Sequence, residues 1–116
     1  MPGAIRVKRI YDPPEPDDGH RVLVDRLWPR GVSRERAALD EWARDLSPSD
    51  ELRRWSHHDP ERFPEFRRRY RRELATHAGE VERLRQLARS GTLTLLYAAR
   101  DHERNNAVVL AELLEE

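Results

Sequence analysis

The residues best suited to chemistry in this sequence gather just after a short apolar run at residues 22–24. Four such residues follow the run: Asp25, Arg26, Trp28 and Arg30. A carboxylate can serve as a general base, arginine binds phosphate or carboxylate, and a tryptophan ring offers a stacking surface. A change from apolar to charged residues is typical of a buried strand whose end carries polar groups. These residues are therefore the first candidates for a functional site.

A second polar stretch follows a later apolar run at residues 92–98. Its candidate residues are Tyr97, Arg100, Asn105 and Asn106. Open α/β sheets bind ligands outside the carboxyl ends of their strands, so two parallel strands would bring both stretches to one edge. A helix that begins nearby would add free N–H groups, which favour an anion. We therefore predict an anion site between Arg26, Arg30 and Arg100.

In this site Trp28 and Tyr97 would offer stacking surfaces, while Asn105 and Asn106 would bind the ligand or cap the last helix. The alternative is purely structural. Asp25 would then pair with one of the arginines, Trp28 would fill the core, and both asparagines would only be caps.

The apolar patterns predict three strands that position these residues. Residues 5–10 alternate apolar and basic side chains at first, as in an edge strand, whereas residues 92–98 are apolar on both faces, as in a central one. Residues 21–27 form the strand between them along the chain, and a short extra strand is an alternative to helix at residues 39–42. The ten-residue connection at 11–20 is rich in proline and fits either a parallel crossover or a wide antiparallel hairpin.

Helices are predicted between the second and third strands and after the third. A short helix begins at the Ser33 cap, a second at Ser47-Pro48, and the longest at Asp59-Pro60. Gly79 is expected to break this stretch, and Gly91 to end the helix after it. The final helix carries one apolar face at residues 109–114. The predicted fold is a single α/β domain over residues 1–116, with a small, mainly parallel sheet of three or four strands flanked by helices.

Composition limits the function classes. Lys+Arg and Asp+Glu are both 22, so no net charge draws the chain to nucleic acid or membrane. All the bases except Lys8 are arginine, which suits anion recognition but also follows from a GC-rich genome. The absence of cysteine excludes disulfides, thiolate nucleophiles and cysteine metal sites. With no long apolar run and no signal-peptide pattern, we expect a cytoplasmic protein with no membrane partner.

Two further clusters are interpreted as structural. His57-His58-Asp59 resembles a metal cluster, but adjacent histidines point apart and Asp59 serves as a helix cap, so no metal and no cofactor are predicted. The basic run at residues 67–72 could bind nucleic-acid phosphates. Pairs at helical spacing, Glu65–Arg69 and Arg69–Glu73, favour a solvated helix face instead.

Four segments of the sequence resemble the YeaO-like branch of a bacterial domain-of-unknown-function family. They are residues 6–13, 23–31, 39–42 and 93–99, of which Asp-Arg-Leu-Trp-Pro-Arg-Gly is highly specific. The resemblance implies a mainly parallel sheet and a tight parallel first crossover, but no catalytic residue. Relatives outside this branch often carry a Cys-His-Arg string after the last strand, where this sequence has Arg104-Asn105-Asn106-Ala107.

The leading functional prediction is the binding of a small anionic ligand, such as a nucleotide, phosphate or carboxylate, at the carboxyl edge of the sheet. The first alternative is an enzyme acting on a phosphoester or nucleic acid, with Asp25 as the catalytic base and the arginines stabilising developing charge. A nucleic-acid-binding protein that uses the Arg67–Arg72 helix face is the weaker alternative. Neither a glycine-rich phosphate loop nor a nucleophile elbow occurs in the sequence.

Overall fold

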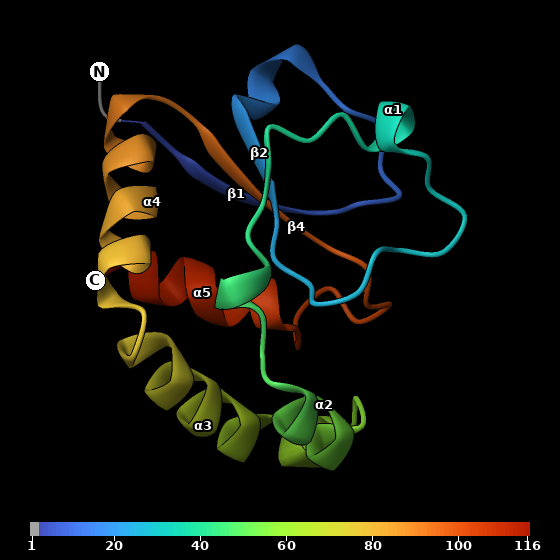
Figure 1. The fold of residues 1–116 in the computed structure, drawn as a ribbon, viewed down its shortest axis with the longest axis vertical. Helices are drawn as coiled ribbons and strands as arrows, with labels where there is room; N and C mark the ends of the chain where they lie inside the picture. Colours follow the sequence, from blue (N-terminus) through green and yellow to red (C-terminus); the bar gives the residue numbers. More distant parts are fainter. Residues whose placement is uncertain (1–2) are drawn as a thin grey trace.

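The computed structural model describes residues 3–116 and contains one parallel β-sheet with helices around it (Figure 1). The four strands are β1 (Ile5–Arg9), β2 (His20–Leu23), β3 (Glu41–Trp42) and β4 (Leu93–Tyr97). The helices are α1 (Arg34–Ala37), α2 (Asp50–Ser56), α3 (Phe63–Ala75), α4 (Ala78–Ser90) and α5 (Asn106–Glu115). Three short 3-10 helices lie at Pro16–Asp18, Arg44–Leu46 and Pro60–Arg62.

The strand order is β1-β4-β2-β3, and every neighbouring pair is parallel. The predicted α/β fold is therefore confirmed, as are the edge position of β1 and the central position of β4. The first connection is a parallel crossover, as the resemblance implies, and not a hairpin, but β1 and β2 are not neighbours in the sheet. β4 lies between β1 and β2, with Ile5 of β1 and His20 of β2 both paired with Leu93.

Two apolar clusters cover the two faces of the sheet. The larger contains Val22, Leu95 and Tyr97 on the sheet side and is covered by α3, α4 and α5. The smaller, on the opposite face, joins Leu23 and Leu96 to the α1 region and to Trp28 and Trp42. Alternate residues of β4 thus pack on opposite faces, which explains why this strand is apolar throughout.

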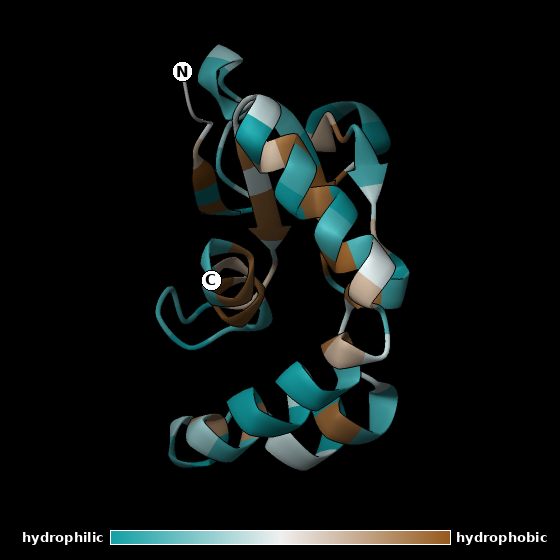
Figure 2. Ribbon diagram, turned by 90° about the vertical axis from the view of Figure 1, so that its left-hand side faces the viewer, coloured by the Kyte–Doolittle hydropathy of each residue, from teal (hydrophilic) through white to brown (hydrophobic). Residues whose placement is uncertain are grey.

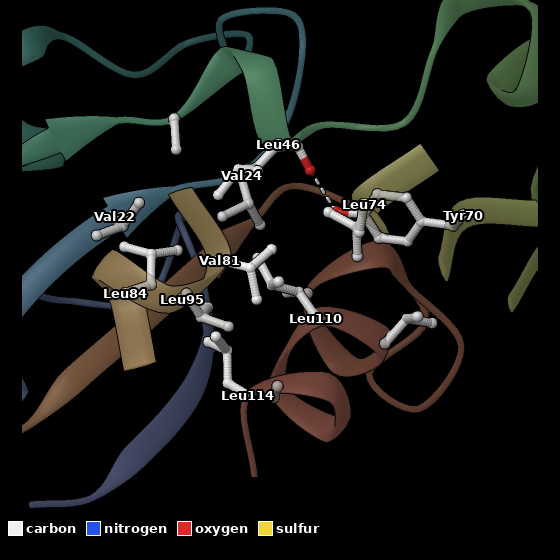
Figure 3. Close-up of a cluster of buried hydrophobic side chains, with 14 of the residues drawn as sticks. Val22, Val24, Leu46, Tyr70, Leu74, Val81, Leu84, Leu95, Leu110 and Leu114 are labelled. Atoms are coloured by element: carbon white, nitrogen blue, oxygen red, sulfur yellow. Dashed lines mark hydrogen bonds between the residues drawn. The ribbon is translucent and has the colours of Figure 1, made fainter. Parts of the chain in front are cut away.

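Helix α5 lies between the sheet and α3 (Figures 1 and 2). Tyr70 of α3 is fully buried, and its hydroxyl donates a hydrogen bond to the carbonyl of Leu46, as Figure 3 shows. Leu74 on the same helix packs in the same cluster as Leu110 of α5. These contacts hold the α2–α3 region against the carboxyl end of the sheet.

Several predicted boundaries are wrong. Ser49, not Ser47, caps α2 by accepting a hydrogen bond from the backbone N of Leu52, while Ser47 binds the carbonyl of Arg44 instead. Gly79 lies inside α4, and the break falls two residues earlier, where His77 precedes the helix in a non-helical conformation. The capping functions of Ser33 and Asp59 are confirmed.

The second strand is shorter than predicted, because its regular pairing ends at Leu23 and only the backbone N of Val24 continues to the carbonyl of Leu96. Gly91 directly follows α4 as predicted, but its backbone is extended (φ −179°) rather than left-handed. The alternative of a short strand near residues 39–42 is confirmed as β3. None of the helices in residues 3–116 is long and apolar enough to cross a bilayer.

Candidate functional site

Asp25 joins three elements at the carboxyl edge of the sheet. It lies two residues after β2, and its Oδ2 accepts a hydrogen bond of 2.9 Å from the backbone N of Ala98, just after β4. Its Oδ1 accepts a hydrogen bond of 3.1 Å from Nδ2 of Asn106, the first residue of α5. The same amide nitrogen donates to the carbonyl of Val24 at 2.8 Å. The side chain therefore holds β2, β4 and α5 together, and within residues 3–116 it has no direct cationic partner.

The surroundings of Asp25 raise the pKa of its carboxyl group. Burial is the main cause, because it removes water from the charged form. The hydrogen bonds from Asn106 and Ala98 lower the pKa, as do the charges of His58 and Arg53, but they offset burial only in part. A carboxyl with a raised pKa at the edge of a sheet is a candidate for an acid, a base or a polar ligand contact.

A cavity of about 340 Å³ opens beside Asp25. One side is formed by the loop after β2 and by the residues between β4 and α5, and the other by α2, the turn that follows it and the first turn of α3. The residues that line it are Asp25 to Arg30, Pro48, Arg53, Ser56, His58 to Pro60, Phe63, Phe66, Ala98, Ala99 and Arg104 to Asn106. The cavity therefore lies at the edge of the sheet where the sequence predicts a site, but one side of it comes from predicted helices that were not expected to contribute to the site.

Four arginines contribute positive charge to this cavity, and His58 also lines it. The side chain of Arg26 donates to the carbonyl of Pro48 at 3.1 Å, and Arg104 pairs with Asp101 at 3.2 Å. Arg53 donates to Asp50 at 2.8 Å, while its Nε is buried and lacks a hydrogen-bond partner within residues 3–116. A buried donor without a partner is uncommon in folded proteins, so this nitrogen marks an incomplete polar site.

Arg30 is an exposed residue that lines the cavity. Its backbone carbonyl accepts a hydrogen bond from the hydroxyl of Tyr11, which positions the backbone there. Gly31 follows with φ +74°, a left-handed conformation that favours glycine, and so the chain can turn at this point. Within residues 3–116 the Arg30 side chain forms no ion pair and is free to contact a ligand.

Apolar side chains form the rest of the cavity surface. The rings of Phe63 and Phe66 stack with their centroids 5.8 Å apart. Leu27 is 58% exposed, and among residues 3–116 it is the one large hydrophobic residue that is exposed. Trp28 also lines the cavity, but its ring packs edge-on against Trp42 at 5.3 Å and its Nε1 donates to the carbonyl of Val32. Trp28 is thus partly a structural residue.

The structure brings six of the eight predicted site residues to the cavity and leaves two outside. The six are Asp25, Arg26, Trp28, Arg30, Asn105 and Asn106. Tyr97 does not line it, because the last residue of β4 faces the large core and its hydroxyl meets Nδ1 of His102 at 3.2 Å. Arg100 is exposed and also lies off the cavity surface.

Asn105 acts as the cap of α5, as one of the alternatives predicts. Its Oδ1 accepts a hydrogen bond from the backbone N of Val108, and its Nδ2 donates to the carbonyl of Asp101. Asn106, by contrast, uses Nδ2 alone in the hydrogen bonds described above. Of the two asparagines, Asn106 therefore keeps more capacity for a ligand.

The residues missed by the sequence prediction come from α2, α3 and the turn between them: Arg53, Ser56, His58, Phe63 and Phe66, together with Arg104. The turn has two successive left-handed residues, His57 (φ 46°) and His58 (φ 56°). A non-glycine residue in this conformation is uncommon and often occurs near functional sites. No group of three or more potential metal ligands is found in the described part of the chain.

The basic face of α3 is largely neutralised by carboxylates. Ion pairs join Arg67 to Glu112, Arg68 and Arg69 to Glu65, and Arg71 to Glu116. The predicted Glu65–Arg69 pair is confirmed. The predicted Arg69–Glu73 pair is wrong, because the Glu73 carboxylate accepts hydrogen bonds from the backbone N and hydroxyl of Ser49.

Comparison with known proteins places the chain in a family. It is 48% identical over 110 residues to the uncharacterized protein YeaO of Escherichia coli (strain K12), covering 95% of this chain and 96% of that protein. Uncharacterized proteins of Mycobacterium bovis and Mycobacterium tuberculosis (strain H37Rv) are 47% identical over 110 residues, covering 95% of this chain and 92% of each relative. No solved structure gives a significant match. The model of the inactive DUF488-N3 subclade matches residues 4–116, and the chain therefore belongs to that subclade.

Proposed function

We infer that this protein binds a small anionic ligand, such as a nucleotide, a phosphate or a carboxylate, in the cavity beside Asp25. The observation that carries this proposal is a local excess of positive charge. Four arginines but only two aspartates line the cavity, although the chain as a whole has no net charge. Arginine presents planar pairs of donors that match carboxylate and phosphate oxygens.

The cavity size narrows the range of ligands. Ligand sites in proteins occupy roughly 300–1,000 Å³, and the volume of about 340 Å³ found here lies at the lower end of that range. A mononucleotide, a sugar phosphate or a small organic acid fits this limit, whereas a dinucleotide exceeds it.

Binding is favoured over catalysis by two observations. The chain has no cysteine, and its segment Arg104 to Asn106 lies on the cavity where relatives outside the branch often carry Cys-His-Arg. The matching family model is itself described as an inactive subclade. The second candidate is an enzyme acting on a phosphoester, which the raised pKa of Asp25 favours, because a carboxyl group whose pKa is raised by burial is suited to acid–base chemistry. Nucleic-acid binding through α3 is disfavoured by the ion pairs on its basic face.

The experiment is a thermal-shift screen with nucleotides, inorganic phosphate and sugar acids, each with and without divalent cations. A ligand at 100 times its Kd stabilises the folded state by about 2.7 kcal/mol, which is readily seen in a domain of this size. Arg30→Ala should reduce this stabilisation strongly and leave the unliganded Tm unchanged, because the Arg30 side chain lies exposed at the cavity.

Arg72→Ala is the matched control, since Arg72 is an exposed arginine on α3 that does not line the cavity. It should leave the ligand-induced shift intact. Equal shifts in both variants would contradict the proposed site. Turnover of a phosphoester that depends on a divalent cation would favour the second candidate.

A further inference from the structure

The cavity has an acceptor-rich interior and a donor-rich mouth. Inside, each carboxylate oxygen of Asp25 receives one hydrogen bond from the protein and can accept another. Both Nδ2 hydrogens of Asn106 are engaged by Val24 and Asp25, so its side-chain carbonyl oxygen remains available as an acceptor. The interior therefore offers acceptors from two side chains that the fold holds in place.

The cationic side chains are partly exposed. The side chains of Arg26, Arg53 and Arg104 are 31%, 37% and 47% exposed, and Arg30 is also an exposed residue. Apolar groups, chiefly Phe63 and Phe66, line the same cavity. The cavity thus combines partly exposed cationic donors, an apolar surface and the acceptors of Asp25 and Asn106.

The combination of cationic donors with the acceptors of Asp25 and Asn106 conflicts with a ligand that carries only negative charge. An anion that filled the interior would set its oxygens against the Asp25 carboxylate, which costs free energy because both groups are acceptors. A ligand with an N–H or O–H group at its inner end would instead complete the unused acceptor capacity of Asp25 and Asn106. The cations at the mouth would still bind its anionic end.

We propose that the ligand is a small amphoteric molecule with a phosphate or carboxylate at the cavity mouth, a flat apolar middle and an amine or hydroxyl donor against Asp25. Amino-aryl and heteroaryl phosphates and carboxylates belong to this class. The proposal rests on the anion site described above and adds the orientation and the inner recognition group. In this proposal Asp25 is a binding residue whose carboxylate accepts a hydrogen bond from the ligand.

A matched pair of probes tests the inner contact in the unmodified protein. Phenyl phosphate and 4-aminophenyl phosphate share the anion and the ring and differ in one amine donor. A hydrogen bond to a charged acceptor corresponds to roughly tenfold in affinity, so the amine-bearing probe should bind about tenfold more tightly by titration calorimetry. Equal affinities would overturn the proposal while leaving the anion site intact, whereas binding of neither probe would count against both.

The ratio of the two affinities should also depend on pH. Both probes carry the same kind of phosphate group, so its titration largely cancels in the ratio, and the acid titration of the aromatic amine is measured on the free probe and subtracted. The preference for the neutral amine should be present above the pKa of Asp25 and should weaken as the pH falls through it. The charges of Arg53 and His58 act on Asp25, and Asp25 in turn acts on Tyr70 of α3.

Two variants separate Asp25 from these neighbours. In Asp25→Asn the tenfold preference should be lost, while Asp17→Asn, at an exposed aspartate outside the cavity, should retain it. Because Asp25→Asn disturbs the hydrogen bonds of Asp25, the fold of this variant is checked by circular dichroism. His58→Gln tests independently whether the amine preference depends on the neighbouring histidine. His58→Gln should keep the amine preference at neutral pH, and loss of the preference there would assign it to His58 instead.

Discussion

One aspartate lies two residues before strand β2 and another lies two residues after it, and the two have opposite surroundings. Asp18, at the amino end, is fully buried and pairs with Arg6, Lys8 and Arg21. Asp25, at the carboxyl end, receives hydrogen bonds from two neutral N–H groups and opens onto a cavity.

The pKa values of the two carboxyl groups move in opposite directions. Burial alone would raise the pKa of Asp18, but hydrogen bonds from the Glu15 backbone, Lys8 and Arg21 outweigh it, and the pKa is lowered. At Asp25 burial prevails and the pKa is raised. The amino end of the sheet is therefore a completed ion-pair network, whereas the carboxyl end retains unused binding capacity. This contrast is the physical reason for placing function at Asp25 and not at Asp18.

The largest expected effect comes from removing the completed network. Asp18→Ala would leave the charges of Lys8 and Arg21 without their central partner, in side chains that are only 11% and 5% exposed. Loss of one partner of a buried ion pair costs about 3–5 kcal/mol, and urea unfolding should show a loss near this range. Asp17→Ala, at the exposed neighbouring residue, is the control and should change stability little. A loss below about 1 kcal/mol for Asp18→Ala would remove the contrast between the two ends.

A smaller effect should appear in the pH dependence of unfolding. The lowered pKa of Asp18 stabilises the fold above the unfolded value of 3.8, and this contribution is lost as the pH falls through the folded pKa. The raised pKa of Asp25 has the opposite sign. The folded state binds the proton of Asp25 more tightly than the unfolded state does. The contribution of Asp25 to stability is therefore fully present below pH 3.8 and is lost as the pH rises through the folded pKa.

Chemical unfolding of the parent, Asp18→Asn and Asp25→Asn proteins across acidic pH measures how the contribution of each aspartate changes with pH. The other carboxylates cancel when the free energy of unfolding of a variant is subtracted from that of the parent. The parent's advantage over Asp18→Asn should shrink with falling pH. The free energy of unfolding of the parent relative to Asp25→Asn should instead increase as the pH falls, at pH values above 3.8. Parallel curves for the two variants would show that the two aspartates are equivalent.

The smallest effect is expected from Arg53. Arg53→Met should change the free energy of unfolding by no more than about 0.5 kcal/mol, because its ion pair with Asp50 is half-exposed and its buried Nε has no partner to lose. Arg21→Met is the matched comparison. It removes a buried side chain that donates to Asp18 and to the carbonyls of Ala37 and Ala38, and it should cost several times more. Equal costs would assign Arg53 to the structural framework and weaken its place in the ligand site.

The sequence predicts the side of the site at the strand ends better than the side that α2 and α3 form. The strands are visible because β4 is apolar on both faces and β2 turns from apolar to charged, and the parallel arrangement then places Asp25 near Asn106. Arg100 follows β4 directly but does not line the cavity, because adjacency along the chain does not determine the direction of a side chain after a strand ends. Tyr97 does not line the cavity either, since the alternation along β4 turns its side chain into the core.

The side of the cavity that α2 and α3 form depends on tertiary packing. The buried Tyr70 hydroxyl bonds to the carbonyl of Leu46, and this contact helps bring Phe63 and Phe66 of α3 toward the sheet edge. No local pattern in residues 50–66 indicates where that helix will dock. The left-handed conformations of His57 and His58 are likewise invisible in the sequence, because glycine would be the expected residue at such positions.

The position of β4 between β1 and β2 has a consequence for the order in which the chain can fold. β1 has β4 as its neighbour in the sheet, although the whole helical region separates the two along the chain. During synthesis on the ribosome, residues 5–9 must therefore wait for residues 93–97 before they gain their strand partner. Such long-range pairing slows folding and leaves an unpaired strand exposed to other chains in the meantime. A nascent chain that stops within α4 should consequently be a target for chaperones, however well its helices have formed.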